Sequence, residues 1–315
     1  ASGAEEIYRN GSLFALEPEL FREVTVTRGP AESFRYTSGA IGGTVEAQTK
    51  NASDFLEDGD TFAFRQKLGY ESNGNGMTST SILAWAPGDK LDVLAFVGYR
   101  TTDDRTDGDG TVQDATGFDQ PSALFKANYR LSDASTLTFG YAYNKIPEYD
   151  VPYNAYQPNW SSTLVDRVTE DTTVYVAHRY NPSGSDLINV ESRLTFKDEH
   201  MDISDPSDGS TSGIYNADHD TRTVALRVEN EAKFGLGITD HVLTTGVELA
   251  HRVRTSTLHS GTYAGYNDYS APGGTEDSVA VYLADKIEVG DKFSLTPQLR
   301  YESQKIVSDG NDYTA

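Results

Sequence analysis

The chain has 315 residues and a formal net charge of −22 at pH 7, an acidic balance that argues against nucleic acid as a partner. It contains no cysteine, which excludes disulfides, thiolate nucleophiles and cysteine metal sites. It also lacks any run of about 18 apolar residues, so no transmembrane helix is predicted.

The first 60 residues differ in pattern from the rest of the chain. Residues 17–21 predict a helix start, with Pro18 in the first turn and acidic residues near the positive end of the helix dipole. A short β segment at 24–26 is followed by a turn and then by a glycine-rich run that leads into another strand. The run lacks the spacing of a nucleotide-binding loop, so its glycines are interpreted as sites of close backbone packing. The motif residues are Gly29, Pro30, Gly39, Gly42 and Gly43.

From residue 61 onward, eleven segments are strand-like. In several of them apolar and polar side chains alternate with period two, which is typical of strands with one apolar face. In the last segment, for example, Leu299 and Tyr301 share one face while Arg300 and Glu302 share the other. The segments are residues 61–71, 77–86, 90–101, 122–131, 134–145, 172–181, 186–198, 220–233, 240–256, 278–289 and 292–305.

The connections between these segments alternate between short and long. Tight turns such as 86–89 and 290–291 alternate with long polar loops, and the one exception is a short connection at 72–76. Outer-membrane barrels have short periplasmic turns and long extracellular loops, whereas a soluble β-sandwich has no reason to sort its loops in this way. We therefore predict an all-β membrane protein with an antiparallel transmembrane β-barrel. The long loops are predicted near 102–121, 146–171, 199–219 and 257–277.

The last predicted strand ends in an outer loop at residues 308–312. A sheet edge left open in lipid would expose a row of unpaired N–H and C=O groups, each costing several kcal/mol. We therefore expect further C-terminal strands beyond this chain; the alternative is a smaller barrel closed by oligomerisation.

The run Leu16–Lys50, LEPELFREVTVTRGPAESFRYTSGAIGGTVEAQTK, resembles the end of the plug domain of TonB-dependent outer-membrane receptors. That family shows a pattern DPELLxxVEVxRGP…YGSGAIGGxVxxxT, from which this sequence departs at Thr37. The resemblance implies that residues 1–55 are the C-terminal part of a mixed α/β plug that lies inside the barrel. Residues 56–315 would then be the N-terminal half of a barrel of about 22 strands.

Two further stretches, Thr49–Phe62 and Val97–Gly110, are similar to the haem and haemoglobin receptor branch of the family. This implies TonB-dependent active import of an iron-containing ligand, haem or a ferric siderophore, across the bacterial outer membrane. Neither enzymatic activity nor an intrinsic cofactor or metal is implied. The implied partners are TonB with ExbB and ExbD, outer-membrane lipid and lipopolysaccharide, and the extracellular ligand. The alternatives are an importer of an oligosaccharide or a cobalamin-like ligand, and a passive porin or adhesin, which the plug motif disfavours.

The resemblance also implies that Arg28 of the plug pairs with carboxylates that face the barrel lumen. The candidates on the predicted inner face are Glu191, Glu229, Glu231 and Glu248. The alternative is that these glutamates solvate the lumen or pair with barrel arginines, namely Arg227, Arg252 and Arg254.

Four residues are candidates for ligand binding because tyrosinate and imidazole can ligate haem iron. They are Tyr8 in the plug and His200, His219 and His259 at the edges of predicted outer loops. No two of these histidines have the spacing of a ligand pair, and the alternative for each is ordinary packing.

Overall fold

The computed structural model describes residues 18–29, 33–36, 42–152, 164–205, 216–259, 264–265, 272–290 and 292–309. Near the start of the chain, β1 (Phe21–Arg28) pairs antiparallel with β2 (Gly43–Thr49) in a small sheet of its own. Single 3-10 turns accompany it: η1 (Pro18–Leu20), η2 (Ser33–Arg35) and η3 (Ala52–Asp54). The helix predicted at 17–21 is only the turn η1, because Phe21 already pairs with Thr49.

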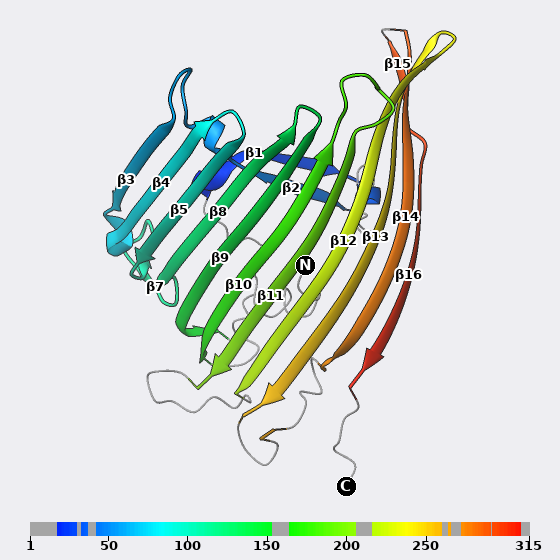
Figure 1. Cartoon of the computed structure of the whole chain (residues 1–315). Helices are drawn as coiled ribbons and strands as arrows, with labels where there is room; N and C mark the ends of the chain where they lie inside the picture. Colours follow the sequence, from blue (N-terminus) through cyan, green and yellow to red (C-terminus); the bar gives the residue numbers. More distant parts are fainter. Residues whose placement is uncertain are drawn as a thin grey trace.

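A second sheet contains twelve antiparallel strands and confirms the predicted fold class (Figure 1). From β3 to β14 each strand pairs with the next strand of this sheet along the chain, while β15 and β16 both pair with β14. The sheet curves around β1 and β2 (Figure 1). Its first strands are β3 (Phe62–Glu71), β4 (Gly76–Gly88), β5 (Leu91–Thr102), β8 (Phe118–Ser132), β9 (Ser135–Pro152) and β10 (Leu164–Tyr180). The remaining ones are β11 (Val190–Ser204), β12 (Ala217–Leu236), β13 (Thr239–Leu258), β14 (Gly274–Val289), β15 (Phe293–Leu295) and β16 (Gln298–Ser308).

All the predicted segments are strands, but several run further than their alternation indicated. β9 and β10 extend into the loop predicted at 146–171, where the guanidinium of Arg167 binds Glu148 at 2.8 Å. The last segment, predicted as one strand, is divided into β15 and β16. Pro297 lies between them and has no N–H to offer the ladder.

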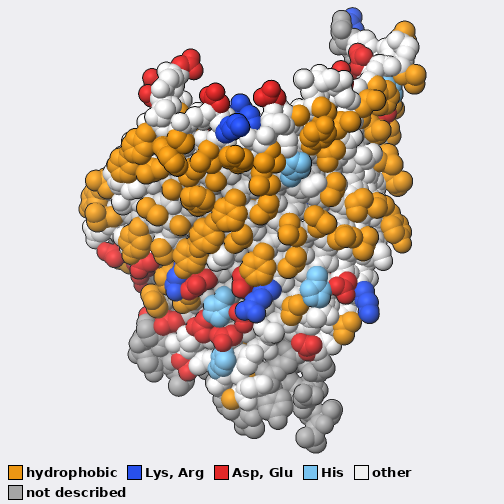
Figure 2. Space-filling model, in the orientation of Figure 1, with side chains coloured by type: hydrophobic (Ala, Val, Ile, Leu, Met, Phe, Trp, Pro, Cys, Tyr) orange, Lys and Arg blue, Asp and Glu red, His pale blue; other side chains and the backbone are white. Residues whose placement is uncertain are grey.

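Apolar side chains form continuous cross-strand rows on the convex face of the sheet. In one row Leu194 lies opposite Leu226, which in turn lies opposite Leu249 and then Val279. These side chains are 39–51% exposed, so no protein layer within the described residues covers them. Figure 2 shows the resulting apolar band across the face, with charged and histidine side chains gathered below it. In the described residues no helix is long and apolar enough to cross a membrane.

A buried cluster joins the small sheet to the wall. Leu20 and Ala52, at 2% and 0% exposure, pack with apolar side chains on the concave face of β4, β5 and β8. Those side chains are Ile82, Ala84, Leu94, Phe96 and Leu124. The segment from Pro18 to Asp54 is therefore anchored on the inner side of the curved sheet.

Candidate functional site: the interface between the small sheet and the curved wall

Two glycines with positive φ, Gly29 and Gly43, lie at the end of the β1–β2 pair. Gly43 has a φ of +128°, and a Cβ at this position would lie 2.1 Å from the carbonyl oxygen of Thr27, so only glycine fits there. Gly29 has a φ of +79° and donates its N–H to the oxygen of Gly42 at 3.1 Å. Pro30 and Gly39 lie outside the described residues. Close backbone packing, as predicted for the motif, is thus found at Gly43, whereas a Cβ on Gly29 or Gly42 would meet nothing within 4 Å.

Ion pairs join the turn η1, just before the small sheet, to β3. The carboxylate of Glu19 contacts the ammonium of Lys67 at 2.6 Å and the guanidinium of Arg65 at 3.2 Å. The hydrogen bond from Lys67 is the largest influence on Glu19 and lowers the pKa of its carboxyl below the usual value. Lys50 also donates to the carbonyl oxygen of Glu19 at 2.9 Å. These contacts hold one end of the inner segment against the first strand of the wall.

The other end is bound by a buried barrel arginine. Arg300 of β16 donates to the carbonyl oxygens of Phe34 at 3.2 Å and Arg35 at 3.4 Å. Its side chain is only 4% exposed, and its charge is balanced by Glu302 at 2.9 Å and Glu248 at 3.5 Å. A charge removed from water to this extent is tolerated only when it is paired and hydrogen-bonded.

Arg35 and Tyr36 extend this contact to β12 and β13. The guanidinium of Arg35 lies 3.8 Å from the carboxylate of Glu229 and donates to the hydroxyl of Thr244 at 3.3 Å. The guanidinium of Arg227 lies 4.8 Å from the ring centroid of Tyr36, a cation–π distance. Phe34 also meets the ring of Tyr282 in β14. Four strands, β12, β13, β14 and β16, therefore receive residues 34–36, which we call the 34–36 segment.

Arg28 was predicted to pair with glutamates of the wall. In the described part of the chain, the arginine that reaches one of these glutamates from the inner segment is instead Arg35, which lies 3.8 Å from Glu229. Arg28 is exposed at the end of β1, whereas Arg35 follows in the next turn and points at the wall. Of the four glutamates, Glu229 and Glu248 lie in this interface. Glu191 and Glu231 instead pair along their own strands, with Arg193 at 3.0 Å and Lys233 at 3.3 Å.

Sequence reasoning did not single out Phe34, Tyr36, Tyr282 or Arg300 as members of this site. Arg300 was predicted on the polar face of its strand, but its partner could not be read from the strand alone. A usable signal was the glycine at 246 in an otherwise alternating strand, since strand glycines often mark a close approach by another group.

The candidate histidines do not converge on one ligand position. His200 lies opposite Asp220 and binds it at 2.8 Å, while the next position, Met201, lies opposite His219. His200 and His219 therefore face opposite sides of the sheet. His219 is buried and bonded to Ser256 at 2.7 Å, and His259 is bonded to Asp218 at 2.6 Å. Tyr8 lies outside the described residues.

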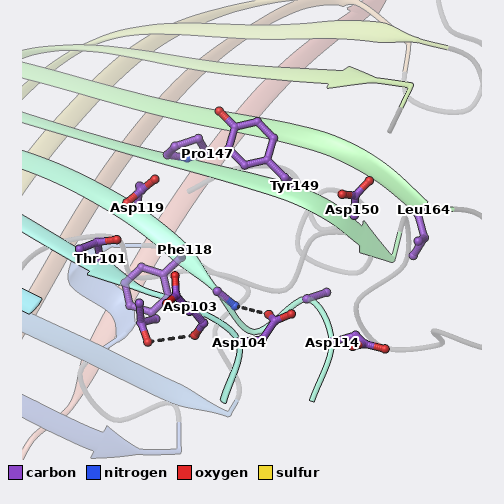
Figure 3. Close-up of a pocket in the computed structure, with 13 residues that line it drawn as sticks. Thr101, Asp103, Asp104, Asp114, Phe118, Asp119, Pro147, Tyr149, Asp150 and Leu164 are labelled. Atoms are coloured by element: carbon purple, nitrogen blue, oxygen red, sulfur yellow. Dashed lines mark hydrogen bonds between the residues drawn. The ribbon is translucent and has the colours of Figure 1, made fainter. Parts of the chain in front are cut away.

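A cavity of about 610 Å³ opens at the long-loop end of β5, β8 and β9 (Figure 3). Its lining contains Phe118, Tyr149 and five carboxylates, from Asp103, Asp104, Asp114, Asp119 and Asp150. Asp104 accepts the N–H groups of Thr116 and Gly117 at 2.9 Å, and so ties the loop that carries the hairpin β6 (Arg105–Thr106) and β7 (Val112–Gln113). Within the described residues no group of three or more acidic, histidine or cysteine side chains is arranged to hold a metal.

Comparison with known proteins shows what the chain resembles. Residues 179–315 match the family model described as TonB dependent receptor-like, beta-barrel. The chain is 26% identical, over 91% of its length, to TonB-dependent heme receptor A of Haemophilus influenzae, of which it covers 42%. The second half of the chain is thus similar to the barrel of TonB-dependent receptors, and nearly the whole chain is similar to this relative. The corresponding protein of Haemophilus ducreyi is 25% identical over 97% of this chain, which covers 45% of it.

A solved structure of another protein shares the fold. A double mutant of the Serratia marcescens hemophore receptor HasR, in complex with its hemophore HasA and heme, superposes with a TM-score of 0.77. The two are 19% identical, and the match covers 91% of this chain and 40% of that one. The chain thus spans less than half the length of the relatives it matches.

Proposed function

We propose that the protein imports an iron-containing ligand across the bacterial outer membrane, driven by TonB. Residues 1–55 would form the end of the plug and residues 56–315 the first part of the barrel. The observation that carries the proposal is the 34–36 segment, bound to the concave face of a wall whose convex face is apolar. A wall that is apolar outside and polar inside suits a bilayer around a wet lumen, and a bound inner segment obstructs that lumen.

The strengths of the contacts suit a plug that must be held and still be moved. The ion pairs of Glu19 have partners about half exposed, and such pairs are worth about 0–1 kcal/mol each. Arg300 is buried, yet its charge is balanced by barrel glutamates and only its hydrogen bonds reach the plug. Withdrawal of the 34–36 segment therefore leaves no buried charge without a counter-charge.

Haem is the first candidate ligand and a ferric siderophore the second. Two relatives that match over nearly the whole chain are named TonB-dependent heme receptor A, which supports haem. Tyr8, His200, His219 and His259 stay candidate ligand residues. Because His200 and His219 face opposite sides of the wall, a single haem would use only one of them.

TonB, acting with ExbB and ExbD, is the proposed source of energy, because a plug held by many contacts needs work to move. Outer-membrane lipid is the proposed neighbour of the apolar band, with lipopolysaccharide at the level of the charged side chains beyond it. The family consists of transporters, so we propose no enzymatic activity and no intrinsic cofactor.

Growth of a deletion strain tests the proposal. Cells without the gene, with other iron sources removed, should fail to grow on haemin and should recover when the gene is restored. A matched culture on a ferric siderophore should grow normally. Normal growth on haemin would overturn the haem assignment, and a defect on the siderophore alone would favour the second candidate.

A further inference from the structure

Three inward-facing positions lie side by side on β12, β13 and β14. Glu229 is opposite Gly246, and Gly246 is opposite Tyr282. The ring of Tyr282 lies across Gly246, since a Cβ on that glycine would be 2.2 Å from Cζ of the ring and 2.3 Å from its hydroxyl oxygen. Contacts below 3 Å of this kind cannot be accommodated without moving the ring, so the missing side chain at 246 forms a notch that seats Tyr282.

In this seat the tyrosine hydroxyl joins two charged side chains. It accepts a hydrogen bond from Nε of Arg227 at 2.9 Å and donates one to Oε2 of Glu229 at 2.8 Å. Both partners continue to the plug: Glu229 faces Arg35 at 3.8 Å, and the guanidinium of Arg227 lies 4.8 Å from the ring of Tyr36. The hydroxyl thus helps to orient both contacts, together with the direct pair between Arg227 and Glu229 at 2.8 Å.

The ring of Tyr282 also contacts Phe34, the remaining residue of the 34–36 segment. Phe34 meets Tyr282 edge-on, with the ring centroids 5.9 Å apart and an interplanar angle of 72°, a favourable aromatic geometry. Arg300, which binds the main chain of Phe34 and Arg35, lies 5.6 Å from the same ring. Tyr282 is 4% exposed and touches, directly or through one partner, every residue of the 34–36 segment.

We propose that Tyr282, seated on Gly246, is the positioning residue that sets how firmly the barrel holds the 34–36 segment and hence how readily the plug opens. The proposal deepens the proposed transport function and rests on it for the consequence for import. The holding of the segment itself is a property of the protein that can be measured without any ligand.

The barrel contains a matched control for this arrangement. Tyr175 of β10 lies across Gly140 of β9, where an added Cβ would be 2.1 Å from Cε1 of the ring. The cation on that ring is Arg193 of the barrel, at 4.6 Å, rather than a group tied to the plug. The same substitutions at this second seat therefore change a ring packed on a glycine of the wall without loosening the 34–36 segment.

The experiment compares Gly246→Ala and Tyr282→Phe with Gly140→Ala and Tyr175→Phe in the full-length protein. Hydrogen exchange of the peptide that contains residues 34–36 reports opening, and vancomycin sensitivity of the cells reports leakage past the plug. Tyr282→Phe keeps the ring but loses the bridging hydroxyl, so exchange of the segment should become about fivefold faster. Gly246→Ala displaces the ring and should produce a larger increase together with vancomycin sensitivity. The thermal midpoint of the barrel should fall by a similar amount at both seats.

Equal exchange of the 34–36 segment in the Gly246 and Gly140 variants, at matched thermal midpoints, would overturn the positioning role. Rescue by the double variant Gly246→Ala with Tyr282→Ala, which clears the clash without restoring the bridge, would overturn it as well. Haemin uptake is measured separately. Loss of segment protection with no haemin uptake in any variant or in the wild type would contradict the transport proposal while leaving the positioning role supported.

Discussion

The guanidinium of Arg300 donates a hydrogen bond to the main-chain oxygen of Phe34 at 3.2 Å, and so links β16 to the plug through the backbone. Because the acceptor is a carbonyl, the contact does not depend on the chemistry of the plug side chain. The charge of Arg300 stays balanced by Glu248 and Glu302 whether or not the plug is present. Plug withdrawal at this point exchanges two hydrogen bonds for bonds to water, a change of modest free energy.

Arg300→Lys is expected to weaken this contact. An ammonium is a point donor and cannot span two carboxylates and two carbonyls as the planar guanidinium does. We expect the hold on the plug to fall by about 1–3 kcal/mol, measured as faster limited proteolysis between residues 33 and 49. Arg193→Lys is the control, because its pair with Glu191 is about half exposed on both sides. Similar proteolysis rates for the two variants would contradict the role of Arg300.

Gly43→Ala should disrupt the β1–β2 pair, whereas Gly42→Ala should be tolerated. At 43 the new Cβ meets the oxygen of Thr27 at 2.1 Å in a backbone conformation of φ +128°, while at 42 nothing lies within 4 Å. We expect the first variant to lose about 1–3 kcal/mol of local stability, and the second less than about 1 kcal/mol. Hydrogen exchange of β2 distinguishes them, and equal protection in both would show that the strain is absent.

The sequence predicts those features of the fold that a single strand determines on its own. Alternation along a strand reports its two faces, so the outward position of Leu226 and the inward position of Glu229 were accessible from the sequence. Strand ends were less accessible, because β9 and β10 are extended by pairs such as Glu148 with Arg167, which form only between partners. Pro297 was a visible signal for the interruption between β15 and β16.

The site was less accessible for a different reason. The choice between Arg28 and Arg35 as the plug cation depends on how the small sheet is placed across the wall, and no local pattern encodes that placement. The contact from Arg300 to Phe34 joins residues 266 positions apart in the sequence. Gly246 was the one local clue, and its meaning depends on the register that places it opposite Tyr282.

Contact between Glu19 and β3 should depend on pH. The hydrogen bond from Lys67 lowers the pKa of Glu19, so its stabilisation is complete above the ordinary carboxyl pKa and is lost as the pH falls through the lowered value. Glu19→Gln should remove this dependence and at neutral pH cost up to about 1 kcal/mol. Protection of η1 against hydrogen exchange between pH 3 and 7 is the measurement. Glu57→Gln, at an exposed glutamate, is the control, and an identical pH profile in all three proteins would refute the contact.

Leu226→Arg and Ala225→Arg should differ although the residues are adjacent. Leu226 lies in the apolar row on the convex face, and an arginine there should cost about 2–4 kcal/mol at the middle of the bilayer. Ala225 faces the lumen side, where arginine is hydrated at lower cost. Heat-modifiable mobility of the folded barrel in outer-membrane extracts checks this, and greater loss of folded protein for Ala225→Arg would reverse the assigned faces.

A reversible tether between Arg35→Cys and Thr244→Cys tests whether the 34–36 segment must leave the wall during transport. These 315 residues contain no cysteine, so within them a reducible bis-thiol linker would join only these two positions, whose native side chains lie 3.3 Å apart. The tethered protein should bind haemin at the cell surface but not import it, and import should return to the rate of the untethered double variant once the linker is reduced. Import at that same rate while the tether is intact would contradict a gated plug.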